Sequence, residues 1–148
     1  MAHFSFQRGD QVEVCSKLEG FLGSYYEATV VANMGTNYVI QYNNLVEEFN
    51  DSVPLKETVK AAEVRPLPPE IREANAVFHV GDRIDAYDLD GWWVGTISSE
   101  ENGSGHQSVF FETTGQELDY PVSKLRVHQD WRNGKWVSSK KTKRSAVR

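Results

Sequence analysis

The sequence contains two copies of one short pattern, and this internal repeat limits the possible folds more than any other feature. The first copy opens with Gly9-Asp10 and the alternating run 11–14, and the second opens with Gly81-Asp82 and the run 83–86. In both copies a Gly-Asp turn leads into alternating polar and apolar residues, which is typical of a β-strand. The repeat therefore predicts two copies of one small β unit.

Further strands are predicted in the same order within each copy. An aromatic pair opens the second strand, Tyr25-Tyr26 in the first copy and Trp92-Trp93 in the second. Short strands separated by turn signals, with about sixty residues per copy, predict an all-β fold made of two small, strongly bent barrels. A third and a closing strand complete each copy, at 38–42 and 62–66 in the first and at 108–112 and 124–128 in the second.

These patterns divide the chain into three parts. A first barrel is expected over 4–69, a second over 76–137, and a basic flexible tail over 138–148. The prolines near position 68 predict a stiff connector, and 70–76 has the composition of a helical turn. Because domains this small bury little surface, we expect the barrels to pack together, with a groove that holds an extended peptide.

The charge of the chain is unevenly distributed. All 21 acidic residues and 11 of the 16 basic ones precede Val137, which gives that part a formal charge of −10 and the tail +5. An acidic body repels the phosphates of nucleic acids and attracts cationic partners. The composition therefore favours a basic peptide as the ligand and disfavours nucleic acid, including a stacking platform for single-stranded RNA.

Signals for catalysis, metals, cofactors and membranes are absent from the sequence. The four histidines have no metal-ligand spacing, and the one cysteine, Cys15, excludes an internal disulfide and a cysteine-based zinc site. No nucleophile–base arrangement, apolar run of membrane-spanning length or signal peptide is recognisable. We therefore expect a binding protein of a reducing compartment, with no cofactor, no metal and no membrane partner.

The ordered motifs together resemble the plant Agenet domain, a Tudor-like domain of the Royal superfamily. The strings that carry the resemblance in the first copy are 12–14, 19–26, 38–42, 54–57 and 64–69, and those in the second copy are 81–86, 90–95 and 125–131. The resemblance covers about 4–137. It implies a nuclear chromatin reader of a histone tail, with histone H-three dimethylated at lysine nine as the mark and gene silencing in heterochromatin as the setting. It also implies one tandem unit of a longer multi-Agenet protein.

A methylated ammonium keeps its charge but loses hydration and hydrogen-bond donors, so aromatic faces bind it well. Each ring contributes on the order of 0.5–2 kcal/mol. The family places this cage at an open barrel end, on positions that correspond here to Phe21, Tyr26 and Tyr42. Alternation turns Tyr26 toward the barrel mouth, and Tyr25 to the opposite face. Supporting carboxylates are expected from Glu47, Glu48 and Asp51, although such residues are also typical of a solvated loop.

The second copy is the less favoured candidate for the cage. It offers Trp93 and Phe111 at the equivalent positions, and either ring could instead be core. Its shorter loop carries Tyr87 and Asp88 but no aromatic residue at the Phe21 position. Trp92, like Tyr25, could fill an interface between the barrels, and Trp131 and Trp136 are interpreted as packing of a closing segment.

Two alternatives to a methyl-lysine reader are left open by the residues alone. One is a protein–protein adaptor whose aromatic barrel ends hold an unmethylated partner. The other is a module that binds methylarginine or an RNA-associated complex.

Overall fold

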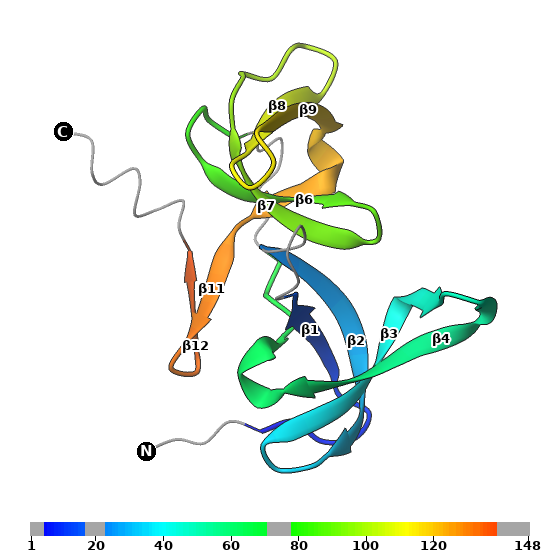
Figure 1. Ribbon diagram of the computed structural model, residues 1–148. Helices are drawn as coiled ribbons and strands as arrows, with labels where there is room; N and C mark the ends of the chain where they lie inside the picture. The colour runs from blue at the N-terminus through cyan, green and yellow to red at the C-terminus, as the bar shows by residue number, and fades with distance from the viewer. Residues whose placement is uncertain (1–4, 17–22, 71–77, 139–148) are drawn as a thin grey trace. The chain divides into compact units, whose positions relative to one another are not determined.

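The computed structural model describes residues 5–16, 23–70 and 78–138. The chain forms two compact units: Met1–Leu67 with Leu89–Gly91, and Pro68–Asp88 with Trp92–Arg148. The described residues form twelve strands and two single-turn 3-10 helices (Figure 1). The predicted all-β fold is therefore confirmed. None of the described helices is long or apolar enough to cross a membrane. Apart from Glu70, the proposed helical turn at 70–76 lies outside the described residues, as does the tail from 139 onward.

The first unit is an antiparallel sheet with the strand order β5-β1-β2-β3-β4. Its second strand alternates regularly, with Ser24, Tyr26, Ala28 and Val30 buried and the residues between them half-buried. A register shift after Val30 bends this strand, as a small barrel requires. The elements are β1 (Gln11–Cys15), β2 (Ser24–Asn33), β3 (Asn37–Glu47), β4 (Asn50–Lys60), η1 (Ala61–Glu63) and β5 (Val64–Pro66).

The second unit repeats this arrangement with the order β10-β6-β7-β8-β9. Its elements are β6 (Arg83–Asp88), β7 (Gly91–Ile97), β8 (His106–Phe111), β9 (Gln116–Pro121), η2 (Val122–Lys124) and β10 (Leu125–Val127). A separate hairpin follows, formed by β11 (Gln129–Arg132) and β12 (Lys135–Ser138), in which Trp131 and Trp136 are cross-strand partners with ring centroids 5.1 Å apart. The fourth strand of each barrel, β4 and β9, was missing from the sequence prediction.

The two Gly-Asp turns have the same hydrogen bonds in both barrels. Gly9 and Gly81 both have positive φ, 94° and 96°, which only glycine adopts without strain. Asp10 accepts a hydrogen bond from the Gln7 amide at 2.8 Å, and Asp82 accepts one from the His79 amide at 2.9 Å. The turn seen in the sequence is thus the same structural unit in each copy.

Each barrel has its own apolar core. The first is formed around Val12, Ile40 and Val30, and the second around Ile84, Ile97 and Val109, all at most 1% exposed. The strands bury one face by alternation, so the inward residues of neighbouring strands meet in the barrel interior. These cores fix the rings at the barrel ends.

Outside each core lies a repeated ion pair covered by an aromatic ring. In the first barrel, Arg65 contacts the buried Glu13 at 2.8 Å and stacks on Tyr25, with its guanidinium carbon 3.7 Å from the ring centroid. The second barrel repeats this arrangement with Arg126, Asp85 and Trp92, at 2.8 and 4.1 Å. Tyr25 and Trp92 are therefore the stacking partners of structural arginines.

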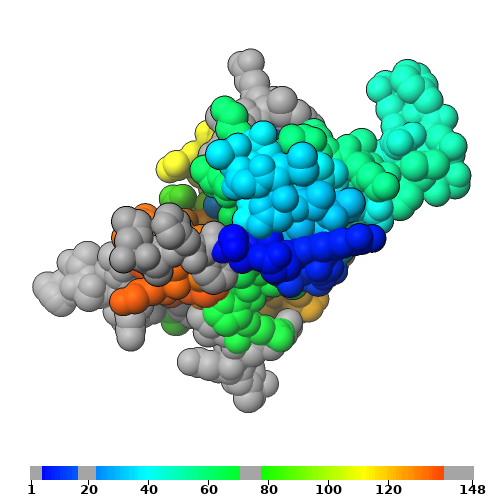
Figure 2. Space-filling view, turned by 90° about the horizontal axis from the view of Figure 1, so that it is seen from below, coloured from blue at the N-terminus to red at the C-terminus, as the bar shows by residue number. Residues whose placement is uncertain are grey.

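The β3–β4 hairpin is the main difference between the barrels. Ile40 pairs with Glu57 and Val109 pairs with Leu118, so sixteen residues lie between the partners in the first barrel and eight in the second. The added residues form an extension that projects away from β1 and β2 (Figures 1 and 2). We call residues 43–54 the β3–β4 finger.

Candidate functional site

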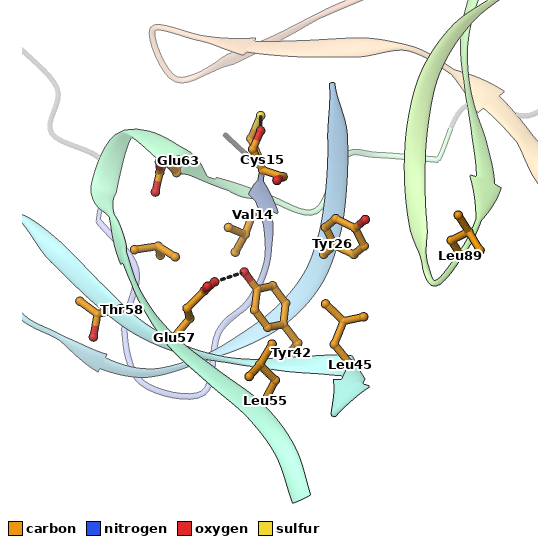
Figure 3. A pocket seen from close by; sticks show the side chains of 12 residues that line it. Val14, Cys15, Tyr26, Tyr42, Leu45, Leu55, Glu57, Thr58, Glu63 and Leu89 are labelled. Atoms are coloured by element: carbon orange, nitrogen blue, oxygen red, sulfur yellow. Dashed lines mark hydrogen bonds between the residues drawn. The ribbon is translucent and has the colours of Figure 1, made fainter. Parts of the chain in front are cut away.

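A pocket opens at one end of the first barrel, where β1, β2, β3 and β4 meet (Figure 3). Tyr26 from β2 and Tyr42 from β3 stand next to each other in it, with ring centroids 6.3 Å apart and ring planes at 84°. Two nearly perpendicular rings form two walls of a corner. Apolar side chains complete the lining, with Val14, Leu45 and Leu55 among them.

A carboxylate stands beside these rings. The Tyr42 hydroxyl donates a hydrogen bond to Glu57 Oε1 at 2.5 Å, and Glu57 is otherwise exposed on β4. Among the described residues this is the one hydrogen bond that the Glu57 side chain makes. The carboxylate therefore retains acceptor capacity for a group that enters the pocket.

Burial sets the charge state of the tyrosines. It raises the pKa of Tyr42 far above the ordinary 10.0, and the hydrogen bond to Glu57 adds to the shift. Burial likewise raises the pKa of Tyr26. Both rings are therefore neutral phenols at physiological pH, and the negative charge near them comes from Glu57 and Glu63 beside Tyr42 and from Asp90 near Tyr26.

The predicted residues of the first barrel separate into three groups. Tyr26 and Tyr42 lie together in the pocket, whereas Phe21, the third proposed ring, lies outside the described residues. Tyr25 lies on the other face of β2, over Arg65. The proposed carboxylates Glu47, Glu48 and Asp51 are exposed on the β3–β4 finger and are not among the residues that line the pocket.

Two carboxylates of the pocket, Glu57 and Glu63, were missing from the sequence prediction, as were its apolar walls. The string 54–57 carries Glu57, but the fourth strand was not predicted, so its alternation could not be used. Glu57 and Leu55 are two residues apart on β4, so their side chains lie on the same face of the strand and both line the pocket. Glu57 could have been predicted if the segment after the acidic turn had been recognised as a strand.

At the equivalent end of the second barrel, the aromatic side chains have hydrogen-bond and ring partners within that barrel. Trp93 and Phe111 occupy the places of Tyr26 and Tyr42, but the Trp93 ring nitrogen donates to the Asp88 carbonyl at 2.8 Å. Tyr120 packs on Phe111, with centroids 6.0 Å apart, and donates to the Asp88 carboxylate at 2.8 Å.

The remaining second-barrel candidates also have structural partners. Tyr87 packs against Trp92 at a centroid distance of 5.1 Å, with the Lys124 ammonium 5.8 Å from its own ring centroid. Leu118 stands where the first barrel has Glu57, and the carboxylate that accepts a tyrosine hydroxyl in the second barrel is Asp88 instead. Both barrel ends therefore combine aromatic rings with a carboxylate, and the pocket described above lies at the end of the first barrel.

Among the described residues, no group of three or more His, Cys, Asp or Glu side chains could hold a metal ion. Cys15, at the pocket end of β1, donates a weak hydrogen bond to the Ser16 carbonyl at 3.7 Å. The chemistry of the pocket is that of aromatic faces, apolar walls and two carboxylates, Glu57 and Glu63. Such a set suits a weakly hydrated cation.

Two bent five-stranded barrels in tandem, one with an aromatic corner at its open end, define the class of Tudor-like interaction modules. Residues 9–69 match the model of the Agenet domain. The chain belongs to the Agenet domain family.

Relatives and solved structures agree with this assignment. Protein AGENET DOMAIN (AGD)-CONTAINING P1 of Arabidopsis thaliana is 37% identical over 88% of this chain and 25% of its own length. DUF724 domain-containing protein 3 of the same plant is 30% identical over 85% of this chain and 19% of its own. The chain thus spans about a quarter or less of these relatives.

The similar crystal structures are tandem units of matching size. That of Arabidopsis thaliana AGDP1 AGD34 has a TM-score of 0.82 and 35% identity, and covers 89% of this chain and 88% of its own. That of ADCP1 tandem Agenet domain 3-4 has a TM-score of 0.79 and 32% identity, with 89% and 86% covered. Agenet domains are binding modules for proteins and peptides, and the chain is a tandem module of this kind.

Proposed function

We propose that the chain is a non-catalytic reader of a methylated histone tail and that Tyr26, Tyr42 and Glu57 form its methyl-lysine site. The perpendicular tyrosine pair with a carboxylate beside it carries the proposal. Each ring face attracts a methylated ammonium, and two rings at 84° contact it from two sides. Phe21 is the proposed third ring.

The carboxylate favours an intermediate degree of methylation. A mono- or dimethyl ammonium still has an N–H that donates to Glu57, whereas a trimethyl ammonium has none. An unmethylated ammonium keeps its strong hydration and gains less from the rings. The mark that we propose is histone H-three dimethylated at lysine nine, bound in the nucleus, and its support is the family resemblance together with this chemistry.

The site is tested by titrating histone H-three peptides that are unmodified or mono-, di- or trimethylated at lysine nine, with the same series at the other lysines. We expect the dimethylated lysine-nine peptide to bind most tightly. Tyr42→Ala should weaken it by about fivefold or more, since a ring contact worth at least about 1 kcal/mol is lost. Thermal melting must show that the variant is still folded.

Glu57→Gln is the sharper variant because Glu57 is exposed and its substitution leaves the core intact. It should reduce the preference for dimethyl- over trimethyl-lysine, whereas Glu112→Gln, an exposed carboxylate on the second barrel, should not change it. Equal binding of all peptides would instead support the adaptor reading. A preference for methylarginine peptides would assign a different ligand to the same rings.

A further inference from the structure

The base of the β3–β4 finger forms part of the pocket wall. Leu45 on β3 and Leu55 on β4 line the pocket, and the finger continues outward from them. Val53 is half-buried like Leu55, with the exposed Pro54 between them, so alternation places Val53 and Leu55 on one face. The apolar wall of the pocket therefore continues onto the finger.

Exposed apolar side chains gather at the end of the finger. Phe49, in the turn between β3 and β4, is 93% exposed, and Val46 is 47% exposed. The Asn50 side chain accepts hydrogen bonds from the amide and hydroxyl of Ser52, which orders the turn that presents Phe49. An exposed aromatic residue beside an exposed apolar one is the kind of surface that binds a partner.

The charge of the finger indicates what that partner is. Glu47, Glu48 and Asp51 surround Phe49, and all three are exposed, while residues 43–54 contain no lysine or arginine. The finger thus combines apolar contacts with a formal charge of −3. A basic, extended peptide with an apolar side chain complements both properties.

The finger is suited to side-chain contacts more than to strand addition. Among the described residues β4 pairs only with β3, so its outer edge is open. Pro54 has no N–H group and interrupts any continuous ladder along that edge. Specificity along the finger therefore comes from side chains, as on a surface that reads particular positions of a peptide.

We propose that the β3–β4 finger is a second recognition surface of the first barrel, which binds the basic segment that flanks the methylated lysine. This inference rests on the proposed pocket. Five residues lead from Tyr42 to Glu47, which is roughly 16 Å of extended strand. A ligand of similar extension places a basic side chain at the finger about four to six positions from the methylated lysine, with an apolar side chain between them.

The test uses the full chain and two synthetic peptides that share a central dimethyl-lysine. The short peptide has five residues; the long one has fifteen, with leucine and arginine three and five positions from the dimethyl-lysine. Calorimetry at low salt should give the long peptide an affinity about fivefold higher or more, because it adds charge pairs and apolar contacts. Moving the arginine to one or two positions from the dimethyl-lysine should remove this advantage.

Variants of the finger separate its role from that of the pocket. E47Q/E48Q/D51N and V46S/F49S change exposed residues only, and each should abolish the advantage of the long peptide while leaving the short one unaffected. E112Q/E117Q/D119N removes the same charge from the shorter hairpin of the second barrel and should change neither. If the advantage survives both finger variants, or falls equally in the control, the finger is not a recognition surface.

An unmethylated long peptide distinguishes failure of this inference from failure of the pocket. If the pocket reads no methyl group, the methylated and unmethylated long peptides will bind alike. Their shared affinity would still depend on the finger residues. If the finger is inert, methylation will matter but the finger variants will behave as the parent chain does.

Discussion

At the scale of single residues, the ion pairs Arg65–Glu13 and Arg126–Asp85 have similar geometry, but we expect them to contribute differently to the free energy of unfolding. Glu13 is fully buried and Arg65 is 6% exposed, so the ion pair has been taken out of water. Such a pair adds little net stability when it is complete, but removing one partner leaves an uncompensated buried charge. Asp85 differs because His128 Nδ1 also contacts it, at 2.8 Å.

We predict that Arg65→Met lowers the free energy of unfolding by about 3–5 kcal/mol, because the Glu13 carboxylate loses its charged partner inside the barrel. Arg126→Met should cost less, since Arg126 is more exposed and Asp85 keeps His128. Urea denaturation measures both. Equal losses would mean that neither the greater exposure of Arg126 nor the His128 contact lowers the cost.

At the scale of strands, β7 and its neighbour β8 lie so close together at one position that only a small residue fits there. A Cβ on Gly95 would lie 2.5 Å from Val109 Cγ1 and 3.0 Å from the Phe110 carbonyl oxygen. The equivalent residue of β2 is Ala28, which is fully buried. Both barrels thus have a small residue at this position of the second strand.

Gly95→Ala should therefore destabilise the second barrel by about 1–3 kcal/mol, because Val109 or the β8 backbone must move. The neighbouring Thr96→Ala, at a half-exposed position, should have the smaller effect. Thermal unfolding of both variants checks this. A Gly95→Ala variant as stable as the parent would show that β8 shifts without cost.

The strands that the sequence predicted are those with a repeated motif or a buried alternating face. β1, β2 and their counterparts have both, and alternation placed Tyr26 inward and Tyr25 outward, as observed. β4 and β9 are mostly exposed, so their alternation is weak and they were missed. Glu57 was missed with them, since a residue on an unpredicted strand cannot be assigned to a face.

The pairing of Glu13 with Arg65 could not be predicted from the sequence either. The two residues are far apart in the chain, and only the β1–β5 register makes them neighbours. The repeat held a usable signal, because an acid in the first strand and an arginine in the last occur in both copies. The ring contact between Phe111 and Tyr120 in the second barrel could not be predicted either, because it required the position of β9.

At the scale of the whole molecule, the charge distribution adds attraction that does not depend on methylation. The part before Val137 carries a formal charge of −10, which raises the local concentration of any basic peptide. Methylation leaves the lysine charge unchanged, so it affects the ring contacts and not this long-range term. Affinity and methyl selectivity should therefore respond differently to salt.

Raising the salt concentration from 50 to 500 mM should weaken binding of a basic methylated peptide by roughly tenfold, since exposed charges are screened. The ratio of methylated to unmethylated affinity should stay nearly constant over the same range. Titrations at four salt concentrations measure both quantities. Affinity that is independent of salt would remove the electrostatic part of the account.

The central claim is that the methylated head lies between Tyr26 and Tyr42. It is tested most directly by NMR of the complex with a histone H-three peptide whose dimethyl-lysine carries ¹³C-labelled methyl groups. We predict that the methyl resonances move upfield through ring currents and show cross-relaxation with the ring protons of Tyr26 and Tyr42. Contacts to Trp93 or Phe111 instead, or methyl signals unchanged from the free peptide, would contradict the assignment.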